Sequence, residues 1–191
     1  MISIPSRLAA LFAIGTALLL GACATPRTPI DDQRQDVRDM AERSLERLYA
    51  SQPRAKDVVA RSAGYAVFSN FGLKILVAGG GSGEGLAVER TTGRETFMKM
   101  IELQAGLGFG VKRFDLVFVF DNKTAFDRFV DSGWEFGAQA TAAAQLNEQG
   151  LAHAGALSVS PGVWLYQLAG DGLALELTAK GTKYYKNDKL N

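Results

Sequence analysis

The sequence predicts an α+β domain. In it a curled antiparallel sheet of about eight to ten strands, forming a small barrel or sandwich, carries an N-terminal helix and one short helix. Two observations favour this class. From Gly64 onward, short apolar runs separated by turn residues recur every 8–12 residues or so, as in antiparallel sheets. Two other segments place apolar residues at the i, i+3, i+4 spacing of a helix packed by one face.

The first 22 residues have the pattern of a secretory signal. Met1–Arg7 carries one positive charge, residues 8–20 form an uninterrupted apolar run, and small residues come after it. The apolar run is shorter than the about 20 residues that span a bilayer. We therefore expect residues 1–22 to be removed and the folded domain to begin further along the chain.

Cys23 is the one cysteine of the chain and follows Leu20, Gly21 and Ala22. This sequence resembles a bacterial lipobox. The resemblance implies that the thiol is lipidated, that the chain is cut before Cys23, and that fatty acids such as palmitate anchor the protein in a membrane. The alternative is an ordinary signal with an incidental cysteine. A lone cysteine at this place disfavours that alternative.

The segment after the cysteine is short and rich in proline. Residues 23–30 contain two prolines and two threonines, which is typical of a tether that separates an anchor from a domain. The residue after the cysteine is Ala24 rather than aspartate. By analogy with enterobacterial sorting, this favours the outer membrane, with the protein facing the periplasm. Residues 31–191 then form a single domain.

The charge balance excludes a nucleic-acid-binding domain. Removal of residues 1–22 takes away Arg7 and no acid, so 20 basic side chains of the original 21 remain against 20 acidic ones. A nucleic-acid partner requires a basic surface. No disulfide is possible with one cysteine, so packing alone must hold the fold.

The first helix is expected over Asp31–Ser51. Its apolar residues share one face, two acids begin it, and Pro53 follows its end. The polar face carries more acids than arginines, whereas a membrane-surface helix has a basic polar face. We therefore expect this helix to pack on its own domain. A second, shorter helix is expected over Arg54–Ser62.

A further helix is expected between the strands, over Thr124–Asp131. Asn122 is suited to cap its start and Gly133 to end it. The strands are separated by turn residues, among them Asn70. The expected strands are Tyr65–Ser69, Leu73–Ala78, Glu84–Arg90, Glu95–Leu103, Gly106–Lys112, Asp115–Phe120, Trp134–Ala144, one at Val159, Gly162–Ala169 and Leu173–Thr178.

The residue types that most enzymes need are scarce. His153 is the one histidine, and a Ser-His-Asp or Cys-His site would depend on it. A zinc site requires three or four regularly spaced ligands. Ser82 is not in a nucleophile elbow, because Glu84 replaces the final glycine of that motif. We therefore expect no enzyme activity, no metal and no cofactor.

Five glycines lie within the seven residues 79–85. Glu84 and Leu86 stand where a dinucleotide-binding fingerprint requires glycine, and no Gly-Lys-Ser/Thr ending of a P-loop is present. The residues after the cluster alternate like a strand. We therefore interpret the cluster as a structural glycine turn, where strands bend or approach another backbone closely. Its residues are Gly79, Gly80, Gly81, Gly83 and Gly85.

Several blocks together resemble the SYLF domain family. The first is the apolar pair Val67–Ser69 and Leu73–Val77 followed by Gly79–Gly85, and the second is Gly106–Gly110 followed by Leu116–Phe120. The resemblance implies lipid binding. Eukaryotic members bind phosphoinositides, yeast members are also described as actin-binding, and bacterial members are commonly lipoproteins.

The C-terminal segment offers a candidate lipid-binding site. Lysines recur every three residues from Lys180, beside two tyrosines, and lysines near an anionic headgroup surface contribute about 1 kcal/mol each. The alternative is a solvated tail. The candidate residues are Lys180, Lys183, Tyr184 and Lys186. We therefore expect an outer-membrane lipoprotein with a non-catalytic lipid- or amphiphile-binding domain, or else a structural or assembly protein of the envelope.

Overall fold

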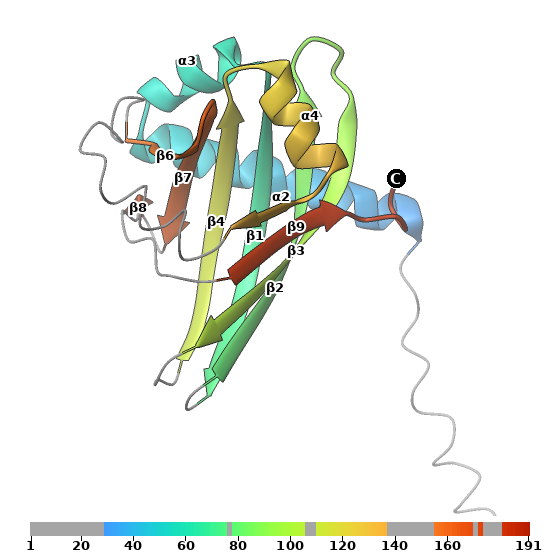
Figure 1. The fold of residues 1–191 in the computed structure, drawn as a ribbon, viewed down its shortest axis with the longest axis vertical. Coiled ribbons are helices and arrows are strands. Elements are labelled where there is room, and N and C mark those ends of the chain that lie inside the picture. Colours follow the sequence, from blue (N-terminus) through green and yellow to red (C-terminus); the bar gives the residue numbers. More distant parts are fainter. Residues whose placement is uncertain (1–28, 76–77, 106–109, 137–154, 170–171, 174–180) are drawn as a thin grey trace, which may run out of the picture.

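The computed structural model describes residues 29–75, 78–105, 110–136, 155–169, 172–173 and 181–191. Its strands form one antiparallel sheet in the order β5-β9-β3-β2-β1-β4-β7-β6, with β8 paired to β7 (Figure 1). The strands are β1 (Gly64–Ile75), β2 (Ala78–Glu89), β3 (Glu95–Ala105), β4 (Gly110–Phe120), β5 (Trp134–Phe136), β6 (Leu157–Ser160), β7 (Val163–Ala169), β8 (Gly172–Leu173) and β9 (Gly181–Lys186).

Three helices pack on this sheet within the described residues: α2 (Ile30–Ser51), α3 (Arg54–Arg61) and α4 (Lys123–Asp131). The Asn122 side chain accepts a hydrogen bond of 2.9 Å from the Ala125 amide, which caps α4. Gly133 follows the helix with a φ of 67°, a conformation that suits glycine. The predicted α+β class is confirmed.

The two faces of the sheet carry different cores. The α2 face is the side of the sheet that α2 and α3 cover, and there Val67, Leu86 and Phe97 contact buried residues of the helices. The α4 face is the opposite side, where Phe68 and Phe118 pack with Phe129 of α4. Figure 1 shows α2 and α4 on opposite sides of the strands. The prediction that the first helix packs on its own domain is confirmed.

The glycine cluster lies inside β2 and not in a turn, which corrects that prediction. Odd-numbered positions 79–85 face α4 and are all glycine, while Gly80 lies on the α2 face. Glycine is required at these positions because neighbouring atoms occupy the space that a side chain would fill. A Cβ on Gly83 would lie 2.9 Å from Met100 Cγ, and one on Gly85 would contact the Phe68 ring. The expectation of a close approach therefore fits these two positions.

The C-terminal segment is part of the fold and not a solvated tail. Residues 181–186 form β9, which pairs with Met98–Leu103 of β3. Beyond it, Leu190 is buried in the core under α2. The Asn191 side chain accepts a hydrogen bond from the Phe97 amide and donates one to the Phe97 carbonyl. The alternation of β9 explains why the segment is not a solvated tail: Thr182 and Tyr184 are buried, whereas Lys183 and Lys186 are exposed.

A buried carboxylate ties the β2–β3 connection to α4. The Glu89 side chain is 7% exposed and lies 3.4 Å from both Arg94 Nε and Lys123 Nζ. The Thr92 hydroxyl donates a hydrogen bond of 2.9 Å to it. The Thr92 bond, reinforced by Lys123 and Arg94, holds the pKa of the Glu89 carboxyl below its ordinary value of 4.5.

Glu89→Gln should lower the thermal midpoint at neutral pH and leave it nearly unchanged in acid. Because the folded pKa of Glu89 is lowered, its stabilisation is present above about pH 4.5 and is lost as the pH falls through the folded pKa. Thermal unfolding of both proteins between pH 7 and pH 3 measures the effect. The control is Glu95→Gln, since Glu95 is one-third exposed and pairs with Arg38 alone among the described residues. If the thermal midpoints of the unsubstituted protein and the Glu89→Gln variant differ by the same amount at every pH in this range, the prediction is contradicted.

Candidate functional site

The sheet extends beyond the helix that covers its α2 face. Figure 1 shows β1–β4 running well past α2 at their lower ends. On this extension three large apolar side chains are exposed: Phe71 (48%), Ile101 (45%) and Leu103 (69%). The strand register places them all on the α2 face. No described element covers them, and an exposed apolar patch of this kind marks an interaction site more often than an inert surface.

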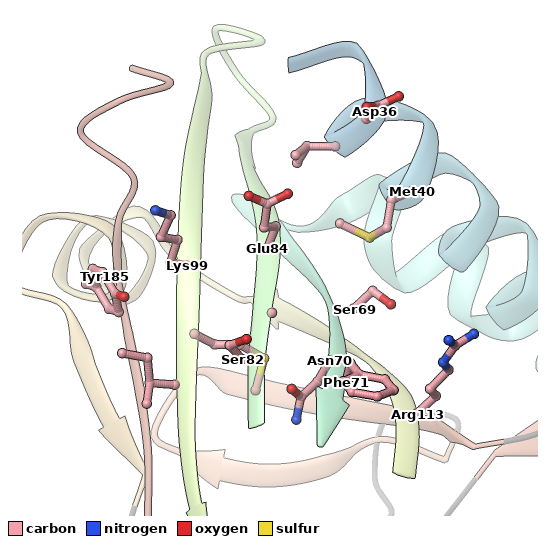
Figure 2. Close-up of a pocket in the computed structure, with 14 residues that line it drawn as sticks. Asp36, Met40, Ser69, Asn70, Phe71, Ser82, Glu84, Lys99, Arg113 and Tyr185 are labelled. Atoms are coloured by element: carbon pink, nitrogen blue, oxygen red, sulfur yellow. The ribbon is translucent and has the colours of Figure 1, made fainter. Parts of the chain in front are cut away.

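An open groove of about 770 Å³ lies between this extension and the first turns of α2. Its volume is within the range of about 300–1,000 Å³ that is usual for ligand sites. Asp36, Val37 and Met40 line it from the helix, and Phe71 and Ile101 line it from the sheet. Figure 2 shows Met40 of α2 pointing toward the sheet residues across this space, whereas Asp36 lies at the rim, on the outer side of the helix. The groove therefore combines apolar walls with charged groups.

Cross-strand register brings the polar groups of the groove together. Ser69 of β1 is opposite Glu84 of β2, Glu84 is opposite Lys99 of β3, and Lys99 is opposite Tyr185 of β9. These residues form one polar row that follows the last apolar row under α2. The exposed apolar residues form the next rows outward, so polarity changes twice along the same face of the sheet.

The charges of the groove are balanced. Asp36 and Glu84 supply two carboxylates, and Lys99 and Arg113 supply two cations. The guanidinium carbon of Arg113 lies 5.4 Å from the centre of the Phe71 ring, a cation–π distance. Among the described residues, none of these four charged side chains is held in an ion pair. They are therefore available to a ligand.

One neighbouring carboxylate is already bound. Asp115, opposite Ser69 on β4, is buried, and its Oδ2 lies 2.6 Å from Arg47 Nη1 of α2. This ion pair fixes the helix to the sheet at the border of the groove. Asp115 therefore belongs to the frame of the site, whereas Glu84 belongs to its lining.

The lysine cluster predicted from the sequence is not one surface. Lys183 lies on the α2 face and pairs with Glu135 at 3.1 Å, whereas Lys186 pairs with Asp131 of α4 at 2.8 Å. Tyr184 is 2% exposed, and burial raises the pKa of its hydroxyl, so it cannot contact a lipid surface. Lys180 lies outside the described residues. A strand disperses these residues because its successive side chains point to opposite faces.

The other predicted sites have different outcomes. Cys23 and His153 lie outside the described residues. Gly79–Gly85 lies beside the groove, and its Ser82 and Glu84 line it. Phe71 was missed because the predicted turn at Asn70 ended the strand before it. Arg113 fell in the gap expected between the strands Gly106–Lys112 and Asp115–Phe120, which β4 joins. Ile101 was placed in a strand, but its exposure depends on where α2 ends over the sheet. The signal that could have found Phe71 is the alternation of Val67, Ser69 and Phe71, which continues through Asn70.

Metal clusters and membrane spans are both absent from the described residues. Their Asp, Glu, His and Cys side chains include no group of three or more that could hold a metal ion. None of the helices in the described part of the chain is both long enough and apolar enough to cross a membrane.

The fold and its groove define a helix-covered, single-sheet domain with an exposed amphipathic site. Comparison with known proteins identifies its family. Residues 101–191 match the family model described as Ysc84, Las17-binding protein actin regulator. The sequence-based resemblance to the SYLF family is thereby confirmed by a match over residues 101–191.

The chain is also similar to a curated bacterial protein. It is 32% identical over 171 residues to beta cell expansion factor A of Aeromonas veronii. The alignment covers 90% of this chain and 63% of that protein. The chain therefore spans less than two thirds of the length of the relative.

Proposed function

We propose that this protein is a lipoprotein anchored by Cys23 in the outer membrane, facing the periplasm, and that its domain binds lipid or another amphiphile without catalysing a reaction. The anchor rests on the lipobox-like sequence before Cys23 and on the proline-containing tether that comes after it. The tether ends at Ile30, where α2 begins.

The observation that carries the binding proposal is the exposed apolar patch beside the groove. Phe71, Ile101 and Leu103 lie on the same face of the sheet, with the small Ser82 between Phe71 and Ile101 and with Leu103 two residues beyond Ile101 on β3. Lys99 and Arg113 lie at the border of this patch. An amphiphile has the complementary division, with an apolar chain joined to a polar head. Burying one large apolar side chain contributes about 1.5–3 kcal/mol, so the patch supplies most of the affinity in this proposal.

The double variant Ile101→Gln, Leu103→Gln should reduce vesicle binding at least tenfold, because it removes two apolar contacts with the lipid. The assay is sedimentation with phospholipid vesicles of residues 23–191 carrying Cys23→Ser, so that no acyl chain is attached. The control is Ile30→Gln, because Ile30 and Ile101 are both 45% exposed but Ile30 does not line the groove. No binding of the unsubstituted domain to any vesicle would refute the proposal.

The alternative proposal is a structural or assembly protein of the envelope that acts through protein contacts. The family description, a Las17-binding protein, favours it because it names a protein as the bound partner. Crosslinking in the envelope tests it. Two results together would support this alternative over lipid binding. A stoichiometric protein partner would be recovered with the unsubstituted protein and lost with the Ile101→Gln, Leu103→Gln variant, and the domain would not bind vesicles.

A further inference from the structure

We propose that the groove selects phospholipids with a zwitterionic headgroup, phosphate and ammonium together, over anionic ones. This inference rests on the proposed lipid-binding function and adds the class of ligand. It comes from the charges that line the groove and not from Lys183 and Lys186, which lie on opposite faces of the sheet and pair with acids.

The groove is lined by equal numbers of acidic and basic side chains. The groove holds two carboxylates, Asp36 and Glu84, and two cations, Lys99 and Arg113. A site for an anionic head has an excess of cations, because each uncompensated carboxylate repels the phosphate. A site for a zwitterion has both signs. The balance of two and two is complementary to a head that carries one phosphate and one ammonium.

The charged side chains of the groove lie at different positions relative to the apolar patch. Arg113 is next to Phe71 in the register of β4 with β1, at the border of the apolar patch. In Figure 2, Glu84 projects from β2 beside α2, opposite Met40, and Arg113 lies on the far side of Phe71 from Glu84. A phosphate joined to the acyl chains therefore fits near Arg113, and the terminal ammonium fits near Glu84, with Asp36 at the rim of the groove.

The apolar patch continues from the charged row toward the end of the sheet. Ile101 is opposite Ser82, and Leu103, one row further out, is opposite Gly80. Gly80 has no side chain and the Ser82 side chain is small, so the surface between Phe71 and Leu103 is open. Acyl chains that leave a headgroup at Arg113 can follow this surface without crossing a charged residue of the described part.

The experiment compares vesicles that differ only in headgroup: phosphatidylcholine, phosphatidylethanolamine, and phosphatidylglycerol with the same acyl chains at one salt concentration. The protein is residues 23–191 carrying Cys23→Ser. We expect it to bind the two zwitterionic lipids more tightly than phosphatidylglycerol. Glu84→Lys should weaken zwitterionic binding roughly tenfold, through loss of a charge-assisted contact, and should strengthen binding to phosphatidylglycerol.

The matched controls separate this site from net charge. Asp57→Lys makes the same change of charge on α3, where Asp57 is exposed and outside the groove, and it should leave the preference for zwitterionic lipids unchanged. Binding of the unsubstituted domain to phosphatidylglycerol that is as tight as or tighter than its binding to the zwitterionic lipids, or equal effects of Glu84→Lys and Asp57→Lys, overturns this inference but leaves lipid binding standing. If the domain binds none of the three kinds of vesicle, both this inference and the proposed lipid binding are overturned.

Discussion

Gly85→Val should prevent folding or lower the free energy of unfolding by about 3 kcal/mol or more, at the upper end of overpacking effects. A Cβ on this residue would contact the Phe68 ring and lie 2.7 Å from the Val67 carbonyl oxygen. Phe68 cannot move aside, because its ring packs against Phe118 and Tyr184 in the buried core. Because the Cβ position itself is occupied, a valine side chain would clash in every rotamer.

The same substitution at Gly80 is the matched control. Among the side chains and backbone groups that the structure describes, a Cβ there would meet only the Glu102 carbonyl oxygen, at 3.5 Å, which is ordinary contact. Valine also has a higher strand propensity than glycine, so Gly80→Val should change stability by less than about 1 kcal/mol. Urea unfolding followed by circular dichroism measures both variants. Equal stability of Gly80→Val and Gly85→Val would show that the inward glycines have no packing role.

Cys23→Ser should move the protein from the membrane fraction to the soluble fraction and abolish its labelling by a fatty-acid analogue. Serine keeps the size of the side chain but removes the thiol that the acyl chain requires. Several buried acyl chains, at about 0.8 kcal/mol per methylene, give an attachment that salt does not reverse. Fractionation after a high-salt wash therefore reports the anchor, since the wash releases protein held only by charged contacts.

Thr25→Ser controls for a change in the tether, because it alters the segment and keeps Cys23. That variant should remain in the membrane fraction and be labelled. Labelling of the Cys23→Ser protein at the unsubstituted level would remove the anchor from the proposed function, while the vesicle experiments on the groove would be unaffected.

The helices were predictable from the sequence, because their signals are local. The first was expected over Asp31–Ser51 and α2 spans Ile30–Ser51, with Pro53 just beyond its end. The α4 helix was expected from its cap at Asn122 and its terminal Gly133, and both perform these roles. Each of these signals acts within a few residues, so the neighbouring strands do not alter it.

The strands were predicted less completely, because partners distant in sequence decide them. Asn70 was interpreted as a turn, but β1 continues through it, since its side chain donates a 2.9 Å hydrogen bond to buried Glu102 of β3. The groove depends on the same register. Glu84 and Lys99 are polar residues of separate strands until pairing places them side by side, and no spacing within either strand reveals their partner.

The position of β9 has a consequence for biosynthesis. It follows all the other described strands in the chain, and its partner β3 lies in the first half of the domain. Until the C-terminus is complete, β3 is an open sheet edge with exposed Ile101 and Leu103 beside unpaired backbone groups. Open apolar edges promote association between chains. A chaperone that shields the nascent domain would therefore act on β3, and stop codons before residue 181 would yield aggregates instead of a smaller folded domain.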